Sequence, residues 1–582
     1  MSHCSLAKTY AVIVSLVVFA LVLSGCGVAA PTAAPAAQAP AQPAQPMPGA
    51  AQRQVNPPAQ PPAQQQPAMP APTQAPAARS SAAEQQAPAQ PSALGGGAGQ
   101  PDAMVLATSP AASASQKACC PPTPIPWPTY PAREAYPYSN KPFVDAREDN
   151  LSTFAMDVDT ASYTKLRDYL RNGQLPPADL IRVEECVNYF QQEYPDPSEG
   201  AFSINLEAAR SPFSPEGTYL LRVGLQGKHI PDYQRKDASL TFVMDVSGSM
   251  QEDNKIEMVK YGLTQLVDQL GPNDRVAIVA FSNDAWVVLE PTSVENRNRI
   301  IDAINSLYPM NSTNTEAGLR LGYELAHRNY RDGVINRVVL ASDGVANVGN
   351  TDPNILAQYA QDYYGRNIFL STVGVGQGNY NDQLLEQLAD KGNGTYSFLD
   401  STEAAERIFA QDLTGTLQTI AKDAKVQVDF NPNVVRRYRL IGYENRAVAD
   451  QDFRNNAVDA GEVGAGHNVT ALYEVELNPE ANADALIARL RYEDPDTHAV
   501  SELSKALKAS EFQGDFNRTS PRFQLTAAVA QFAEILRGNE WAQGAKMRDV
   551  LNVMYNVRNQ LPFDNDVNEF VGLVEQATRL VD

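Results

Sequence analysis

Between residues 238 and 421, short apolar runs alternate with amphipathic segments, a pattern that few folds can accommodate. Runs of strand length are expected at 239–245, 274–281, 286–290, 336–342, 368–375 and 395–399. Helical periodicity is expected between and after them, at 255–270, 295–307, 315–329, 353–364, 381–390 and 402–420. Strands that alternate with helices form a doubly wound, mostly parallel sheet. The sequence therefore predicts an α/β fold for this region.

Two aspartates stand at the ends of predicted strands of this sheet. Asp245 follows the apolar run LTFVM at the end of the first strand, and Asp343 follows VVLAS at the end of the fourth. In the usual strand order these two strands are neighbours, and ligands bind beyond the carboxyl ends of the strands at the point where the order reverses. The topology therefore predicts that both carboxylates converge on one crevice.

Hydroxyl side chains accompany the two carboxylates. Ser247 and Ser249 alternate in the turn after Asp245, so both can point at one spot, and the loop MNSTNTEAG offers Thr313. Mg²⁺ prefers oxygen ligands and keeps some of its waters. Because hydroxyls are neutral, they leave much of the 2+ charge unneutralised, and a carboxylate from a partner would complete the octahedron. The plain alternative is that the serines cap a helix.

The order and spacing of these side chains resemble the metal-ion-dependent adhesion site of von Willebrand factor type A (VWA) domains. The matching residues are Asp245, Ser247, Ser249, Thr313 and Asp343. The resemblance implies that the hydroxyls coordinate Mg²⁺, Mn²⁺ or Ca²⁺ directly and that the aspartates act mainly through water. Asn311 stands where the threonine loop of the family often begins with glycine. The resemblance further implies a protein ligand that presents an acidic residue, and no catalysis.

Segments over the whole predicted folded part extend the resemblance to the bacterial VWA lipoproteins of the YfbK type. They include LSTFAMDVDTASYTKLRDYLRNGQLP, LADKGNGTYSFLD and RLIGYENRAVADQDFRNN. This implies an N-terminal associated region at 133–231, the VWA domain at 238–421 and a C-terminal region of unknown function at 422–582.

Strand and helix patterns also predict how these flanking regions fold. Antiparallel strands are expected within 203–227 and 422–510, and helices within 521–582. The strands at 203–227 have no other sheet nearby in the sequence. We therefore expect the two sets of strands to pair into one β-sandwich into which the VWA domain is inserted.

Residues 1–25 have the features of a lipoprotein signal peptide. A lysine precedes AVIVSLVVFALVL, which is too short to span a membrane, and the following LSGC resembles a bacterial lipobox. This resemblance implies that Cys26 is lipidated; an uncleaved membrane anchor is the alternative. Either way, the rest of the chain is expected at the cell envelope, outside the cytoplasm, on the outer membrane or the cell surface.

Residues 26–132 are rich in proline, alanine and glutamine. Such a segment buries too little apolar surface to offset chain entropy, so a disordered tether is expected. Its reach lies between roughly 55 Å as a flexible coil and roughly 330 Å as a polyproline rod. The roles of Cys119 and Cys120, which lie in this segment, stay open.

Composition and the remaining motifs argue against several classes of function. A net charge of −21 disfavours nucleic acid as a partner. The five cysteines and five histidines form neither a CxxC pair nor an HExxH motif, which argues against a zinc hydrolase. An envelope enzyme that uses the VWA domain only for recruitment, for example a metal-dependent phosphatase or hydrolase, is the alternative function. A structural spacer with an inactive site is a third.

Three other features were open to more than one interpretation. The acidic run MDVDTAS resembles the nucleophile loop of aspartate-phosphorylating phosphatases, but Ala161 breaks the match, so capping of the next helix by Asp159 or Thr160 is favoured. Cys186 lies in a helical pattern of apolar residues and is expected to be buried rather than reactive. Asn445 and Arg446 lie in a polar loop that either bridges domains or has no special role.

Overall fold

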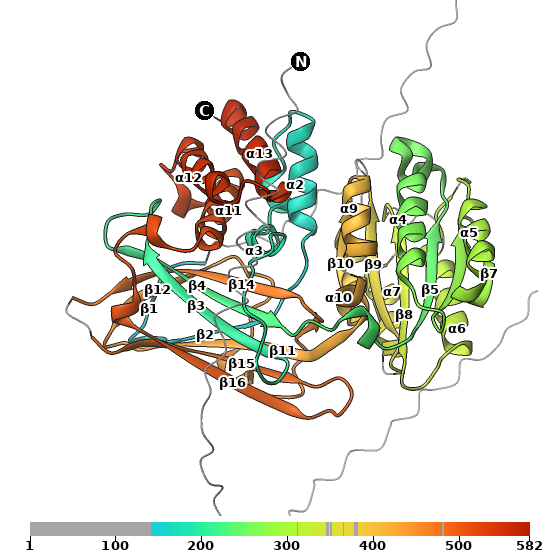
Figure 1. Ribbon diagram of the computed structural model, residues 1–582, viewed down its shortest axis with the longest axis horizontal. Coiled ribbons are helices and arrows are strands. Elements are labelled where there is room, and N and C mark those ends of the chain that lie inside the picture. Colours follow the sequence, from blue (N-terminus) through green and yellow to red (C-terminus); the bar gives the residue numbers. More distant parts are fainter. Residues whose placement is uncertain are drawn as a thin grey trace, which may run out of the picture. The chain divides into compact units, whose positions relative to one another are not determined.

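The computed structural model describes residues 141–582 except 311, 345–348, 350–351, 365, 377–381, 412, 480–481 and 582. The predicted signal peptide, Cys26 and the tether with Cys119 and Cys120 lie outside the described residues, as does Asn311. The described part combines a mixed sheet, two antiparallel sheets and layers of helices (Figure 1).

The mixed sheet occupies the middle of the chain and has the strand order β10-β9-β8-β5-β6-β7. Its strands are β5 (Ala238–Asp245), β6 (Arg275–Phe281), β7 (Ala285–Ser293), β8 (Ile335–Ser342), β9 (Phe369–Val375) and β10 (Tyr396–Leu399). All neighbours run parallel except β7, which is antiparallel to β6 at one edge. The first strand, β5, and the fourth, β8, are neighbours, so the predicted α/β fold and its strand order are confirmed.

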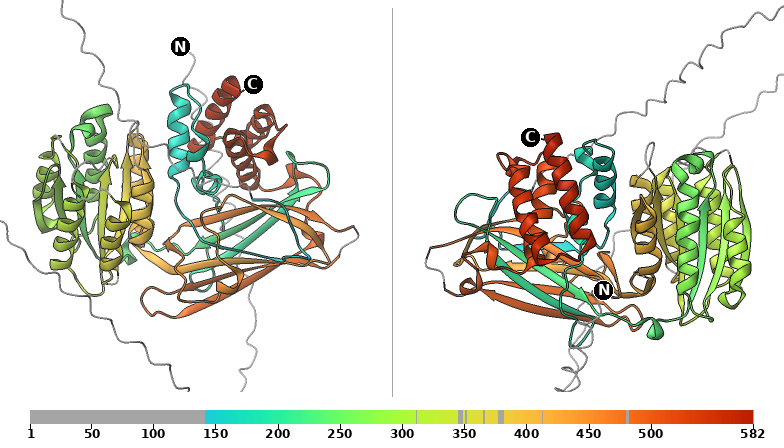
Figure 2. Two further views of the ribbon diagram at one scale, coloured as in Figure 1. Left: turned by 180° about the vertical axis from the view of Figure 1, so that it is seen from behind. Right: turned by 45° about the horizontal axis from the view of Figure 1, so that its top comes forward.

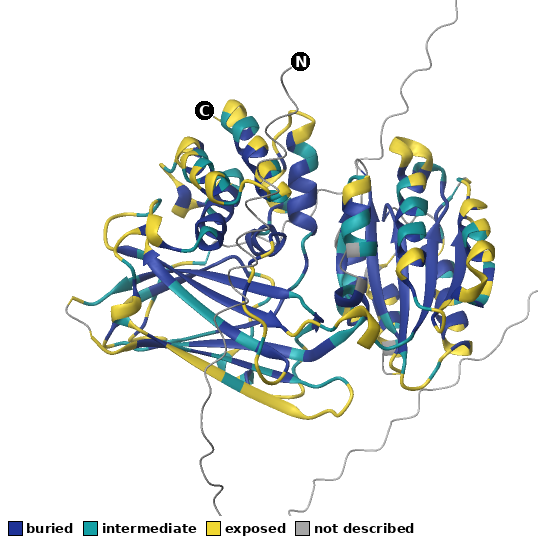
Figure 3. Ribbon diagram, viewed as in Figure 1, coloured by how far each residue is buried: buried dark blue, intermediate teal, exposed yellow. Residues whose placement is uncertain are grey.

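Helices cover both faces of this sheet, which explains why every residue of β5 and β8 is buried (Figure 3). The helical elements are η3 (Gly248–Asn254), α4 (Lys255–Gln269), α5 (Arg297–Asn305), α6 (Thr315–Arg328), α7 (Pro353–Tyr364), α8 (Asp382–Lys391) and α9 (Thr402–Glu406). Phe242 packs in the apolar cluster with residues of α4, α5 and α9, whereas its neighbour Val243 packs with residues of α6, α7 and α8. Alternate residues of β5 thus pack against the helices on opposite faces of the sheet.

The helix predicted at 402–420 is confirmed as far as Leu417, with residue 412 outside the described residues, and is wrong only at its end. The helix α9 ends at Glu406, a π-helical turn η5 (Arg407–Gln411) follows, and a short α10 (Leu413–Leu417) precedes a strand that already begins at Thr419. Residues from Thr419 onward gain more by pairing with a neighbouring strand, so the strand region begins before residue 422.

Strands from both sides of the VWA domain form two antiparallel sheets. One has the order β1-β12-β14-β4-β3, and the other β13-β11-β15-β16 with β2 also on β11. The strands are β1 (Val144–Asp145), β2 (Leu151–Ala155), β3 (Phe202–Arg210), β4 (Thr218–Gly227), β11 (Thr419–Phe430), β12 (Val435–Ile441), β13 (Gly461–Gly464), β14 (Asn468–Leu477), β15 (Asp484–Glu493) and β16 (Val500–Lys508). The strand β4 pairs with β14, and β2 pairs with β11. The predicted pairing of strands across the insertion is therefore confirmed.

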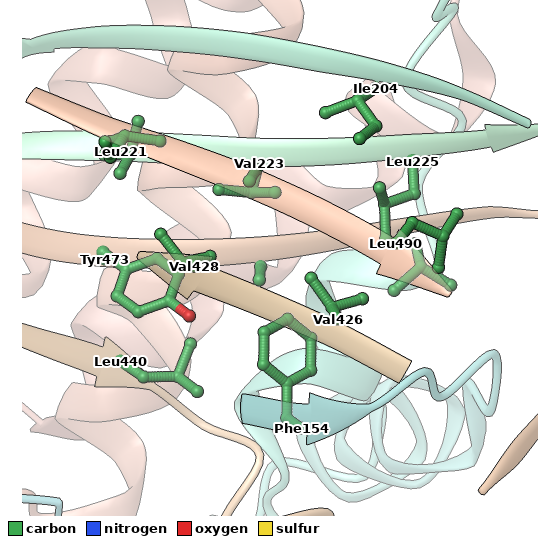
Figure 4. Packing of buried hydrophobic residues seen from close by; sticks show 14 of the residues in the cluster. Phe154, Ile204, Leu221, Val223, Leu225, Val426, Val428, Leu440, Tyr473 and Leu490 are labelled. Carbon is green, nitrogen blue, oxygen red and sulfur yellow. The ribbon is translucent and has the colours of Figure 1, made fainter. Parts of the chain in front are cut away.

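Apolar side chains of the two sheets meet in one core (Figure 4). The labelled members are Phe154, Ile204, Leu221, Val223, Leu225, Val426, Val428, Leu440, Tyr473 and Leu490. Leu221, Val223 and Leu225 alternate along β4, so the same face of the strand contributes three residues to this core. The VWA domain is thus inserted into a sandwich that both chain segments are needed to build.

A layer of helices packs together beside this sandwich (Figure 2). Its members are α2 (Ala161–Arg171), α3 (Val183–Asn188), α11 (Pro521–Arg537), α12 (Met547–Gln560) and α13 (Asn565–Val581). Cys186 lies in their shared core as a free cysteine with 1% of its surface exposed, which confirms the predicted burial. Within residues 141–582, as far as the structure describes them, no helix has the length and apolarity needed to cross a membrane.

Short 3₁₀ turns connect these elements. They are η1 (Ala178–Leu180), η2 (Asp232–Gln234), η4 (Val294–Asn296), η6 (Asp450–Asp452), η7 (Ala509–Glu511), η8 (Phe516–Arg518) and η9 (Glu540–Ala542).

Candidate metal-binding site

The two predicted carboxylates lie at the carboxyl edge of the mixed sheet. Asp245 ends β5, and Asp343 directly follows β8, the neighbouring strand. The hydroxyl of Ser342 donates a hydrogen bond to Oδ2 of Asp245 over 2.6 Å, which fastens the two strand ends to each other. Both aspartates are buried, with 0% and 3% of their surfaces exposed. The structure therefore brings together the two acids that the topology predicted.

The turn after Asp245 places the two serine hydroxyls side by side. Oδ1 of Asp245 accepts a hydrogen bond from the backbone N–H of Ser247 over 2.8 Å, and the hydroxyl oxygens of Ser247 and Ser249 are 3.0 Å apart. Ser247 precedes the turn η3, yet its side chain makes no capping hydrogen bond there. The helix-capping alternative for this serine is therefore not what the structure shows.

The loop that carries Thr313 is attached to the same edge on both sides. The N–H of Met310 donates to the carbonyl of Val246 over 2.6 Å, and the N–H of Asn314 donates to the carbonyl of Ser282 over 2.7 Å. Val246 follows β5 and Ser282 follows β6, so Met310 and Asn314 are both attached to the carboxyl edge of the sheet. Thr313 itself is buried, with 2% of its surface exposed.

Burial makes the carboxylates of this site sensitive to a nearby cation. Burial, followed by the negative charge of Asp343, raises the pKa of Asp245 to about 7, although hydrogen bonds from Ser342 and Ser247 oppose the shift. Oδ2 of Asp343 lies 3.3 Å from the ammonium of Lys255, whereas its Oδ1 is buried without a hydrogen-bond partner. An unsatisfied buried carboxylate oxygen is costly, and a hydrated cation would satisfy it.

The donor set fits a hard divalent ion that keeps part of its water. It consists of hydroxyl and carboxylate oxygens, which suit Mg²⁺, Mn²⁺ or Ca²⁺ better than a thiophilic metal. In the part of the chain that the structure describes, no group of three or more histidine, cysteine and acidic side chains is placed to hold a metal. Any metal at this edge would therefore depend on the serine and threonine hydroxyls.

An apolar hollow of about 370 Å³ adjoins these side chains. It is lined by Val246, Trp286, Val288, Ser306, Leu307, Tyr308 and Met310. Trp286, Tyr308 and Met310 are 38%, 63% and 38% exposed, which is unusual for side chains of this size and polarity. The hollow is not predictable from local sequence patterns, because its residues come from three places: Val246 after β5, the edge strand β7 and the loop after α5. The aromatic residues Trp286 and Tyr308 were the available signal.

The acidic run MDVDTAS lies elsewhere and binds an arginine. Nε of Arg446 is 3.0 Å from Oδ2 of Asp157, its Nη2 is 3.3 Å from Oδ2 of Asp159, and its Nη1 is 3.0 Å from Oδ1 of Asp390 in α8. The backbone N–H of Tyr396 in β10 also donates to Asp159 over 3.0 Å. Arg446 thus bridges the N-terminal region, the C-terminal region and the VWA domain.

The predicted capping of α2 by Asp159 or Thr160 is wrong. Thr160 precedes the helix but makes no capping bond through its side chain, and both oxygens of Asp159 are directed to Arg446 and Tyr396. The carboxylate of Glu185 accepts the N–H of Ser162 over 2.7 Å instead. A residue distant in the sequence has taken the role that local spacing assigned to a neighbour.

Three known families match successive parts of the chain. Residues 131–222 match von Willebrand factor, residues 239–411 match the von Willebrand factor type A domain, and residues 415–580 match the C-terminal part of the uncharacterized protein YfbK. The uncharacterized protein YfbK of Escherichia coli K12 is 34% identical over 470 residues, which cover 76% of this chain and 81% of that protein. The chain belongs to the YfbK family.

Other relatives share smaller parts with this YfbK-family protein. The uncharacterized protein sll0103 of Synechocystis is 30% identical over 208 residues, which cover 36% of this chain and 47% of that protein. Human inter-alpha-trypsin inhibitor heavy chain H4 is 26% identical over 192 residues, or 31% of this chain and 20% of that protein. A solved von Willebrand factor type A structure from Catenulispora acidiphila aligns with 64% of this chain and 89% of its own, at 15% identity and a TM-score of 0.39.

Proposed function

We propose that this YfbK-family protein binds a protein partner through a divalent cation held at the edge of its VWA domain. VWA domains are mostly interaction modules without catalytic activity, which supports a binding role. The residues proposed to hold the ion are Asp245, Ser247, Ser249, Thr313 and Asp343. The observation that carries the proposal is the unpartnered, buried Oδ1 of Asp343 at the same edge as Asp245 and the paired serine hydroxyls.

The side chains at this edge of the sheet have different proposed roles. The hydroxyls of Ser247, Ser249 and Thr313 offer neutral oxygen donors, and Asp245 is held by Ser342 and Ser247 behind them. A bound divalent ion would supply an electrophilic position that an acidic residue of the partner completes. Because hydroxyls do not neutralise the ion, an anionic ligand is favoured over a neutral one.

The hollow beside Val246 supports a protein partner over a small anion. Val246 lines the hollow and lies between Asp245 and Ser247 in the sequence, and the N–H of Met310 donates to its carbonyl. Tyrosine and tryptophan are enriched among the residues that dominate protein interfaces. A volume of about 370 Å³ admits one large apolar side chain of a partner next to its acidic residue.

We also propose that the protein is lipid-anchored through Cys26 at the cell envelope and faces away from the cytoplasm. The lipobox-like LSGC and the preceding short apolar run support this. Replacing Cys26 with serine is expected to release the protein into the soluble envelope fraction, which fractionation and mass spectrometry of the N-terminal peptide would measure. Retention of that variant in the membrane would contradict lipidation at this residue.

Crosslinking in intact cells tests the binding function. The native chain is expected to crosslink to a partner in Mg²⁺ and to lose that partner in EDTA, and Asp245→Ala is expected to lose it in both conditions. Asp302→Ala, at an exposed acid on α5, is the matched control and should behave as the native chain does. Equal recovery of the partner from the native chain in EDTA and from the Asp245→Ala variant, without loss in either case, would contradict the proposal.

A further inference from the structure

A buried lysine reaches into the proposed ion site from its own helix. Lys255 is the first residue of α4, and only 3% of its surface is exposed. The four residues before it, 251–254, are all exposed. Lysine is rarely buried to this degree unless its ammonium is paired. Here Nζ lies 3.3 Å from Oδ2 of Asp343, and both side chains are 4% exposed.

The surrounding backbone is shaped to admit this side chain. Gly376 follows β9 and has a φ of +79°, and a Cβ added there would lie 2.3 Å from Cε and 2.7 Å from Cδ of Lys255. The stem of the lysine therefore passes where any other residue at 376 would place its side chain. Asp253 and Asn254 both adopt left-handed backbone conformations, with φ of 50° and 57°, immediately before the helix begins. This turn determines where Lys255 enters.

The ammonium of Lys255 gives the two oxygens of Asp343 different surroundings. Oδ2 faces Lys255, whereas Oδ1 is buried and has no hydrogen-bond partner. A carboxylate held at one oxygen cannot rotate freely, so the other oxygen keeps its direction. Asp343 is therefore oriented before an ion or its water arrives, and this preorganisation comes from a residue outside the five that the family resemblance identified.

Lys255 also changes the charge that an ion meets. Asp245 and Asp343 together carry two negative charges when ionised, and the ammonium removes one of them. With a divalent ion in place, the group would be left with one net positive charge instead of none. A positive charge beside the ion opposes metal binding and favours an anionic ligand on that ion.

We infer that Lys255 is a positioning residue that weakens metal binding and strengthens binding of the partner's carboxylate. This inference rests on the proposed function, since it assumes that an ion binds at this edge. It goes further by stating why the ligand must be an anion and which side chain enforces that choice. If Lys255 served only to fill space, replacing it would shift the affinities for metal and for carboxylate in the same direction, or would shift neither of them.

The test measures Mn²⁺ and acetate separately on the full-length protein. Calorimetric titration gives the Mn²⁺ affinity, and proton relaxation of the Mn²⁺-bound water reports acetate that displaces a water. Lys255→Met is expected to bind Mn²⁺ about tenfold more tightly, while the acetate concentration at half-saturation rises severalfold. Lys260→Met, at a mostly buried lysine of the same helix that pairs with Glu257, should match the native protein in both measurements.

The outcomes separate the inference from the proposed function. If the native protein binds no Mn²⁺, the proposed function fails. If it does bind and a folded Lys255→Met binds Mn²⁺ equally or less tightly, the inference is overturned. Should the methionine variant fail to fold, as judged by circular dichroism, Lys255→Gln removes the same charge but can still donate to Asp343, and the same opposite shifts are required of it.

Discussion

Two pairs of buried aspartates in this protein contact different cationic side chains. Asp157 and Asp159 share the guanidinium of Arg446, at 3.0 Å and 3.3 Å. In the second pair, Asp245 and Asp343, it is Asp343 that contacts an ammonium, that of Lys255 at 3.3 Å. A guanidinium presents several donors in a planar fork, whereas an ammonium is a compact point charge.

We refer to the carboxylates around Arg446 as the closed cluster and to those beside Lys255 as the open cluster. Arg446 contacts both aspartates and adds Asp390 from α8, so its donors join three chain segments. Lys255 contacts Oδ2 of Asp343 and leaves Oδ1 buried without a hydrogen-bond partner, while the hydroxyls of Ser247 and Ser249 lie 3.0 Å apart at the same edge of the sheet. We infer that the arginine cluster holds the domains together and that the lysine site is the one suited to a further cation.

Removing the arginine should have the largest effect. Arg446→Met leaves Asp157 and Asp159 buried without a counter-ion, and breaking a buried pair from one side costs about 3–5 kcal/mol. Urea unfolding followed by circular dichroism would measure the loss of unfolding free energy. Arg454→Met, at a pair with Glu502 in which the arginine is 63% exposed, should lower the unfolding free energy far less. If the two variants are equally stable, Arg446 does not hold the cluster together.

Another buried acid, Glu184, sharpens the comparison because neither of its oxygens has a hydrogen-bond partner. Burial, and then the charge of Glu444, raises its pKa to about 8. A carboxyl with a raised pKa binds its proton more tightly when folded. Its contribution to stability is therefore full below the unfolded value near 4.5 and is lost as the pH rises through about 8.

Glu184→Gln should remove this dependence on pH. Between pH 5 and 8 the native protein is expected to lose up to about 1.4 kcal/mol per pH unit relative to the variant. Thermal unfolding of both proteins across this range gives the difference. Parallel curves for the two proteins would show that Glu184 is ionised in the folded state.

Divalent cations should stabilise only the open cluster. A ligand at one hundred times its dissociation constant adds about 2.7 kcal/mol to the unfolding free energy. Mg²⁺ is therefore expected to raise the melting temperature of the native protein and of Asp157→Asn, but not that of Asp245→Ala. Differential scanning calorimetry with EDTA as the reference measures this. Equal Mg²⁺ effects on all three proteins would place the ion elsewhere.

The smallest effects are expected at the apolar hollow. Trp286→Ala and Tyr308→Ser remove partly exposed side chains, so stability should change by no more than about 0.5 kcal/mol. Mn²⁺ affinity should be unchanged, whereas partner binding should weaken by about 1–2 kcal/mol if the hollow receives an apolar side chain. Recovery of the partner after crosslinking, compared with Tyr233→Ser at a side chain that is 84% exposed, provides the readout.

Much of the fold followed from local patterns. The alternation of strand and helix predicted the mixed sheet, and the positions of Asp245 and Asp343 at strand ends predicted that they would converge. The insertion into a β-sandwich was also predictable, because the strands at 203–227 needed partners and found them in β14. Periodicity and strand order are properties of consecutive residues, so they can be read without knowing the rest of the molecule.

Only the tertiary structure determines which cationic side chain each buried aspartate contacts. Lys255 and Asp343 are 88 residues apart, and Arg446 and Asp157 are 289 apart. In the sequence each is one charged residue among many, since nothing in its neighbourhood specifies a partner. The change from helix to strand before Thr419 and the capping of α2 by Glu185 have the same origin. Contacts between distant segments outweighed local preference there, because burial makes an unpaired charge or donor costlier than a departure from helix propensity.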